Sequence, residues 1–264
     1  MKLRIITLLV LASIAAAACS DRNARIEIIP VQDNAAPRNM ARGLFPDAPD
    51  SLFSALGLQD GMPSSVCAFL VRTEGKNILF DAANGAPDSR LPHVLDSCGV
   101  APEDIDMVFV THLHGDHIGG LVKDGIAAFP DADIYINDFE YNAWMTMTVE
   151  QSAGLRGIVK AYGDRLKKFK IADVLPCGVE AIAAYGHTPG HTVYRIGDIL
   201  IAGDIMHGVA LQSGHPQYCA RFDMDKVKSV ESRKGILKMA EENGLKVYGM
   251  HFPAPYYLTS MPMM

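Results

Sequence analysis

The sequence lacks several features that would place a chain in a familiar class at once. No block rich in lysine or arginine stands out among its 264 residues, and the formal net charge is −6, so nucleic acid is not an expected partner. No Cys-x-x-Cys pair is present, which argues against a zinc site made of cysteines. No proline- or serine-rich linker and no short-period repeat divides the chain, so we expect one domain over residues 20–264.

The apolar stretch near the N-terminus is too short to span a bilayer comfortably. It covers fourteen residues, Ile5 to Ala18, and follows the basic segment MKLR, which is the layout of a secretory signal. Small residues directly before Cys19 resemble a bacterial lipobox, although Ala16 stands where leucine is usual. We therefore predict a signal peptide of lipoprotein type over residues 1–19, with export to the periplasm and a lipid anchor at the membrane surface. Cleavage and release as a soluble secreted protein is the alternative.

Five cysteines are present, and the first of them is the expected lipidation site. An oxidising compartment permits disulfides without demanding them. The sequence therefore leaves open whether one disulfide or only scattered buried thiols are formed by the remaining four: Cys67, Cys98, Cys177 and Cys219.

The hydrophobic pattern predicts strands and helices in alternation. Segment 65–82 is typical of two strands joined by a turn at Glu74-Gly75-Lys76, because branched and aromatic residues flank a glycine. Further strands are expected at 24–31, 106–110, 132–138, 179–188, 192–204 and 245–252, and helices within 89–99, 117–129, 139–170 and 226–243. This order predicts an α/β protein with mixed sheets.

The stretch THLHGDHIGG places three histidines and an aspartate within six positions, directly after an apolar strand. His112 and His114 are two residues apart, so in extended geometry both imidazoles can face one ion. Asp116 and His117 follow where a helix can begin, and a turn there would direct them toward a second ion. Imidazole nitrogen and carboxylate oxygen favour zinc, with iron, manganese or cobalt as alternatives. Helix capping or ordinary hydrogen bonding would explain one such residue, but not four of them within six positions.

Other histidines and aspartates also follow apolar segments. YGHTPGHTVY contains His187 and His191, LIAGDIMH contains Asp204, and YGMHFPAP contains His251. Loops at the ends of neighbouring strands converge on one rim of a sheet. We therefore expect these side chains to supply further ligands for a site with two adjacent metal ions.

With these motifs the sequence resembles the metallo-β-lactamase superfamily. THLHGDHIGG matches its HxHxDH signature, and GHTPGHT, AGD and GMHFP follow in the order that the superfamily uses. The resemblance covers residues 68–255 and implies a four-layer αββα sandwich with two mixed β-sheets. The stretches AGDIMHGVALQ and FDMDKVKSVESRKGIL look most like the branch that holds methyl-parathion-hydrolase-like and lactonase-like enzymes.

The resemblance also implies a role for each motif residue. His112, His114 and His187 would hold one divalent ion, and Asp116, His117 and His251 a second, with Asp204 bridging the two. Zn²⁺ is the expected ion, with Mn²⁺, Fe²⁺ or Co²⁺ as alternatives. Roles outside the ligand set fall to Asp81, which would support the site from behind, His191, which would shape its loop, and His207, which would line the pocket or act in catalysis.

These assignments predict an exported dinuclear hydrolase. A hydroxide that bridges the metals would attack an ester-type bond in a lactone, an aryl ester or an organophosphate ester, and Asp116 would pass a proton to the leaving group. A thioesterase resembling glyoxalase II and a β-lactamase are the alternatives, and a non-catalytic periplasmic zinc-binding protein is a remote one. The expected partner is a small-molecule substrate, and resembling enzymes are commonly homodimers.

The walls of the substrate pocket are harder to place from sequence. We expect them in variable, aromatic-bearing segments, namely Phe139 to Trp144, the region from Met145 to Tyr162, and Tyr256 with Tyr257. Core packing is an equally good interpretation of these aromatic residues.

Overall fold

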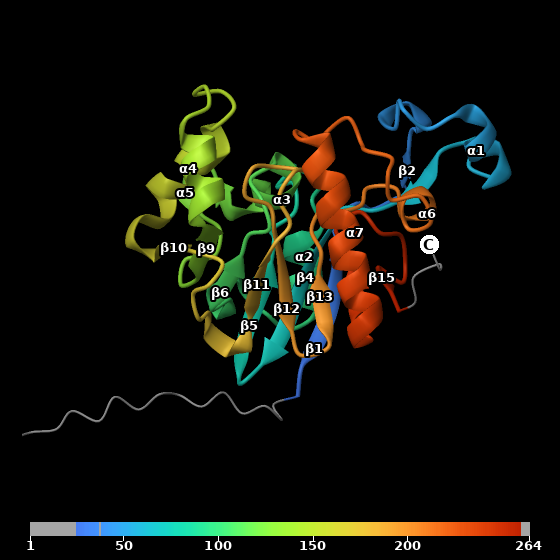
Figure 1. Ribbon diagram of the computed structural model, residues 1–264. Helices are drawn as coiled ribbons and strands as arrows, with labels where there is room; N and C mark the ends of the chain where they lie inside the picture. Colours follow the sequence, from blue (N-terminus) through green and yellow to red (C-terminus); the bar gives the residue numbers. More distant parts are fainter. Residues whose placement is uncertain (1–24, 37, 260–264) are drawn as a thin grey trace, which may run out of the picture.

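The computed structural model describes residues 25–36 and 38–259, so the expected signal peptide and Cys19 lie outside the described part. Two β-sheets face each other, and helices cover their outer surfaces (Figure 1). Among the described helices, none has the length and apolar character that crossing a membrane requires.

The first sheet is mixed and has six strands in the order β1-β4-β5-β6-β9-β10. Its strands are β1 (Glu27–Gln32), β4 (Cys67–Thr73), β5 (Lys76–Phe80), β6 (Met107–Phe109), β9 (Asp133–Asn137) and β10 (Leu166–Phe169). The first three strands pair antiparallel, and β5, β6, β9 and β10 pair parallel. The parallel strands all end at the same edge, and β6 therefore delivers the residues that follow it to that edge.

The second sheet has five strands in the order β11-β12-β13-β14-β15. Its strands are β11 (Glu180–Ala183), β12 (Thr192–Ile196), β13 (Ile199–Ile201), β14 (Lys246–Tyr248) and β15 (Tyr257–Leu258). Only β13 and β14 are parallel neighbours, and the loops after both strands lie at the edge where β6 ends.

Alternating side chains of the strands form the core between the two sheets. In β4, Phe69 points into this central layer, whereas Leu70 points to the outer helical layer. The rings of Phe80 and Phe109 from the first sheet meet Tyr194 from the second, with centroids 5.5 and 5.4 Å from it. Each sheet is thus buried on both faces, as the fold requires.

Helices complete the outer layers. The first sheet packs against α2 (Leu91–Ser97), α4 (Asp138–Met145) and α5 (Ala153–Tyr162). The second sheet packs against α7 (Lys226–Asn243), which lies across it in Figure 1. Ile236, Leu237 and Ala240 of this helix belong to one buried cluster with Leu200 and Val247 of the sheet. The order of layers is helix, sheet, sheet, helix, and the expected four-layer αββα sandwich is confirmed.

Residues 38–64 form an arm that packs beside the sandwich, upper right in Figure 1. The hydrophobic pattern predicted no strand here, but β2 (Arg38–Met40) pairs with β3 (Met62–Ser64) in a small sheet. Between these strands lie η1 (Arg42–Leu44) and α1 (Asp50–Ala55). A separate apolar cluster, which includes Phe45, Met62 and Leu211, fastens the arm to α6 (Val209–Gln212).

Two other segments differ from the expectation. The segment 117–129 contains only the end of α3 (Gly115–Ile118) and η3 (Gly119–Leu121), followed by the hairpin of β7 (Val122–Lys123) and β8 (Ile126–Ala127). Asp124 and Gly125 both have positive φ, which is the geometry of a tight hairpin turn. Residues 166–169 were expected to be helical but form β10. The remaining short elements are the 3-10 turns η2 (Pro102–Asp104), η4 (Gly163–Arg165) and η5 (Pro176–Gly178).

Candidate metal centre

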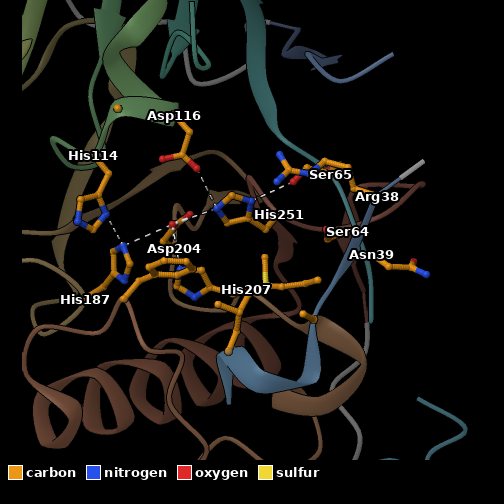
Figure 2. A pocket seen from close by; sticks show the side chains of 15 residues that line it. Arg38, Asn39, Ser64, Ser65, His114, Asp116, His187, Asp204, His207 and His251 are labelled. Carbon is orange, nitrogen blue, oxygen red and sulfur yellow. Dashed lines mark hydrogen bonds and ion pairs between the residues drawn. The ribbon is translucent and has the colours of Figure 1, made fainter. Parts of the chain in front are cut away.

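All seven expected ligands lie at one edge of the sandwich. His112 and His114 follow β6, while Asp116 and His117 lie in α3. The loops after β11, β13 and β14 carry the other three: His187, Asp204 and His251. Figure 2 shows His114, His187, Asp204 and His251 turned toward one another at the floor of a cavity.

Three histidines form the first ligand group, which we define as His112, His114 and His187. The Nε2 atom of His112 lies 3.0 Å from Nδ1 of His114 and 3.2 Å from Nε2 of His187, and the latter two nitrogens are 2.9 Å apart. A tetrahedral zinc ion with Zn–N distances of about 2.05 Å would separate its nitrogen ligands by about 3.3 Å. The three nitrogens are therefore close to the spacing of one face of such a site.

Asp116, His117 and His251 form the second ligand group, and their donor atoms lie within 4.8 Å of one another. The carboxylate of Asp204 lies between the two groups. Its Oδ1 is 3.2 Å from Nε2 of His117, and its Oδ2 is 3.2 Å from Nε2 of His251 and 3.4 Å from Nε2 of His187. The carboxylate of Asp204 is therefore within reach of both groups and would be able to bridge two ions bound there.

The electrostatics of the site suit cations. Within the described residues, Nε2 of His117 and Oδ1 of Asp204 are buried and, although 3.2 Å apart, have no hydrogen-bond partner. Burial, aided by the neighbouring His187, lowers the pKa of His114 to about 3, so this imidazole is neutral and its lone pair is available. Burial acts to raise the pKa of Asp204, but His117, His251 and His207 outweigh it and hold this pKa well below its usual value. These residues therefore fit two divalent ions.

Asp81 lies behind His117, where the sequence placed it. Its Oδ2 accepts from Nδ1 of His117 at 2.6 Å and from the Thr111 hydroxyl at 2.7 Å, while its Oδ1 accepts from the Thr111 backbone N–H at 2.7 Å. Asp81 has φ of +57°, so the chain turns sharply after β5 to bring this carboxylate under the site. A carboxylate on the far nitrogen fixes the orientation of a ligating imidazole.

Two further histidines border the ligands. Nε2 of His191 accepts a hydrogen bond of 2.9 Å from the backbone N–H of Asp204, so His191 positions the loop of that residue. His207 is buried beside Asp204, with its Nε2 3.2 Å from Oδ2 of the carboxylate, and it also lines the cavity. Its ring stacks against that of His251, with the two ring centroids 5.3 Å apart.

Glu140 is a supporting residue that the sequence did not reveal. It lies in α4 and is only 1% exposed, and its carboxylate accepts from the backbone N–H of Leu113 at 3.1 Å and of Gly190 at 2.6 Å. The carboxylate thus joins the loop of His112 and His114 to the loop of His187. An acidic residue in a helix of mixed polarity gives no sign that it is buried.

Asp223 and Arg233 were also missed. Asp223 accepts from Nδ1 of His187 at 3.0 Å and pairs with Arg233 at 3.1 Å. Both residues lie in FDMDKVKSVESRKGIL, a stretch that carries part of the family resemblance but none of the expected ligands.

A cavity of about 380 Å³ lies over the ligands, and its walls are not the expected ones. The arm contributes residues 38–41 and Leu44, and Phe222 contributes another wall. The aromatic residues considered for this role are absent from the lining: Phe139 contacts Tyr185, Tyr257 contacts Tyr248, and Trp144 packs against the His114 ring from outside the cavity. Of the two interpretations left open by the sequence, core packing is the one that fits Trp144 and Tyr162, which belong to the buried cluster of the outer layer.

Comparisons with known proteins agree with this architecture. The family model described as the metallo-beta-lactamase superfamily matches residues 61–230. Metallo-beta-lactamase domain-containing protein 1 of Xenopus laevis is 27% identical over 211 residues, covering 73% of this chain and 78% of the relative.

Solved structures superpose over most of the chain. The hydrolase AbOPH in the beta lactamase superfamily has a TM-score of 0.78 and 28% identity, with 90% of this chain and 91% of that chain covered. The dizinc quorum-quenching lactonase AidC has a TM-score of 0.81 and 24% identity at the same coverage, and this likeness concerns the fold. The protein described here belongs to the metallo-beta-lactamase superfamily and is a metallo-hydrolase of that superfamily.

Proposed function

We propose that the protein is an exported hydrolase with two divalent metal ions that cleaves an ester-type bond in a lactone, an aryl ester or an organophosphate ester. The observation that carries this proposal is the bridging position of Asp204 between two complete ligand groups at the floor of a cavity. Two ions held there would supply a water nucleophile at neutral pH and polarise the oxygen of the electrophile. Histidine and carboxylate donors favour Zn²⁺.

The chain's own residues support the remaining steps. The carboxylate of Asp116 lines the cavity, and its Oδ2 lies 3.5 Å from Nε2 of His251. Its side chain is 38% exposed, so this carboxylate could take the proton that the attacking water gives up and pass it to the leaving oxygen. The arm and Phe222 cover part of the site, which excludes water from the face where the substrate would lie.

The cavity also indicates the kind of substrate. Its volume of about 380 Å³ suits a small molecule. Met40, Leu44 and Phe222 give it an apolar side, whereas Arg38 is the one lysine or arginine in its lining. Figure 2 shows the guanidinium group of Arg38 turned toward His251. A substrate with an apolar chain and a hydrogen-bond acceptor near the ester therefore fits the cavity.

A panel of substrates tests the proposal. Protein loaded with Zn²⁺ or Mn²⁺ is assayed against an aryl ester, a γ-lactone, a phosphotriester, a thioester and a β-lactam, with a chelator-treated control. We expect hydrolysis of at least one of the first three. Preference for the thioester would favour the activity of a glyoxalase II, and no turnover of any substrate would favour a binding protein.

The metal requirement is tested by Asp204→Ala, with Asp198→Ala as the matched control. Asp198 lies in the turn that precedes β13, and its side chain is 67% exposed, whereas Asp204 follows the same strand at the ligand edge. We expect Asp204→Ala to bind fewer than two ions per chain and to lose most activity, while Asp198→Ala behaves like the parent. Full activity with one ion per chain would refute the dinuclear proposal.

Export and lipidation rest on the sequence alone. We expect the mature N-terminal peptide to begin at Cys19 and to carry lipid when the gene is expressed in a bacterium. Cys19→Ser should release the protein from the membrane fraction. A mature chain that still begins at Met1 would contradict this part of the proposal.

A further inference from the structure

Helix α7 carries a charged side chain that is completely buried. Arg233 is 0% exposed, and its guanidinium group donates to the backbone oxygens of Ile205, Pro216 and Tyr218 as well as to the carboxylate of Asp223. Burying an ion costs several kcal/mol, and it is tolerated only where its hydrogen bonds are satisfied. The guanidinium therefore fastens segment 205–223 to α7, and this segment supplies His207 and Phe222 to the cavity.

The carboxylate of Asp223 connects this guanidinium to a metal ligand. Its Oδ2 lies 3.1 Å from Nη2 of Arg233, and its Oδ1 lies 3.0 Å from Nδ1 of His187. The two oxygens of this carboxylate thus have different partners, one the guanidinium and the other the imidazole. With Asp223 on its Nδ1, His187 turns its Nε2 toward His114 and His112, at 2.9 and 3.2 Å.

The backbone around His187 is tied to the start of the same helix. The N–H of Met224 donates to the carbonyl of His187 at 3.2 Å, and the N–H of Asp225 donates to that of Gly186 at 2.8 Å. A Cβ atom at Gly186 would lie 2.1 Å from the backbone nitrogen of Ser229, so only glycine permits this close approach. Both the side chain and the main chain of the His187 loop are thus held by residues 223–225, which lead directly into α7.

The two ligand groups are supported in the same way. Nδ1 of His117, in the second group, is hydrogen-bonded to the carboxylate of Asp81. Nδ1 of His187, in the first group, is hydrogen-bonded to the carboxylate of Asp223. His112 has only the Thr111 hydroxyl on its Nδ1, at 3.1 Å. Within the described residues, each group therefore has one imidazole fixed by a buried carboxylate.

We propose that Asp223 and Arg233 are positioning residues that hold His187 in its metal-binding orientation and set the affinity of the ion bound by the first ligand group. This inference rests on the proposed dinuclear site and adds that one of its two ions is controlled from α7. Loss of such an outer partner weakens metal binding by about 10- to 100-fold. The ion of the second ligand group has its own support in Asp81 and is expected to keep its affinity.

The test measures the two dissociation constants for Zn²⁺ by competition with a chromogenic chelator. The variants are Asp223→Asn, Arg233→Met, Arg233→Lys and the double variant D223N/R233M, with Arg221→Met as an exposed control on the same segment. We expect one constant to rise by about 10- to 100-fold in Asp223→Asn and Arg233→Met, while the other changes little. Arg233→Lys should recover part of the loss, and Arg221→Met should match the parent.

The double variant separates positioning from folding, because it leaves no buried charge without a partner. We expect its metal-free form to melt closer to the parent than either single variant, while the weakened binding of one ion persists. Parent affinity for both ions in the double variant would refute the inference alone. A parent protein that binds fewer than two ions would refute the proposed function and this inference with it.

Discussion

Replacing Glu140 with alanine should destabilise the protein strongly even without metal. Its carboxylate accepts from the backbone N–H of Leu113 at 3.1 Å and of Gly190 at 2.6 Å, and the side chain is buried. Hydrogen bonds to a charged group contribute about 1.5–3 kcal/mol each, so the two together are worth about 3–6 kcal/mol. At about 2–4 °C per kcal/mol for a chain of this size, the melting temperature should fall by roughly 6–24 °C.

Thermal unfolding of the metal-free protein, followed by circular dichroism, measures this effect. Glu231→Ala is the control, because Glu231 is an exposed residue of a helix and such substitutions change stability by about 0.5 kcal/mol or less. Glu140→Gln keeps one acceptor oxygen and should lie between the two. If Glu140→Ala melts together with Glu231→Ala, the two hydrogen bonds do not hold the ligand loops together and the reasoning fails.

Three other predictions concern the surroundings of the ligands. Gly119→Ala should destabilise the fold, since its Cβ would lie 2.0 Å from the carbonyl oxygen of Asn84. Gly115→Ala should fold normally, since its Cβ would meet nothing within 4 Å, and equal melting temperatures of the two variants would contradict this prediction. Cys67 should resist alkylation at pH 8, because burial raises its pKa to about 12, whereas the half-buried Cys98 should react before it. Mass spectrometry of the labelled peptides measures this order, and earlier labelling of Cys67 would contradict the prediction. Zinc binding at pH 6 should release protons, because the carboxylates around His117 outweigh the effect of burial and raise the pKa of this imidazole well above its usual value. Calorimetry in buffers of different ionisation enthalpy measures the release, and a binding enthalpy that does not depend on the buffer would contradict it.

The ligands could be located from sequence because each follows an apolar strand. A strand of unbroken apolar residues must be buried, and polar residues directly after it must lie at the sheet edge. Strands such as β6 and β13 were therefore enough to bring His112 and Asp204 to one rim. The dense spacing of the first motif then indicated which side chains face each ion.

The supporting residues could not be located in this way. Arg233 is one polar residue among many in α7, and its burial depends on carbonyl groups of a segment that begins 28 positions earlier. The walls of the cavity were also hidden, because the arm is placed by contacts such as Phe45 with Leu211, far away in sequence. Local patterns report which residues are buried, but not which distant segment buries them.

The cysteines show the same limit. The sequence left one disulfide or scattered thiols as alternatives, and the structure records Cys67, Cys98, Cys177 and Cys219 as free thiols. Pairing depends on the distance between positions that are far apart in the chain, which composition cannot supply.

The separate apolar cluster of the arm has a consequence for how such an enzyme changes over time. The ligands are held by the sandwich, whereas Met40 and Leu44 belong to a unit fastened by its own small core. Substitutions at Met40 and Leu44 would alter the shape of the entrance, whereas the end of the arm is tied to the floor through Ser65, whose backbone oxygen lies 2.9 Å from Nδ1 of His251. New substrates can therefore be sampled by mutation without first losing the chemistry.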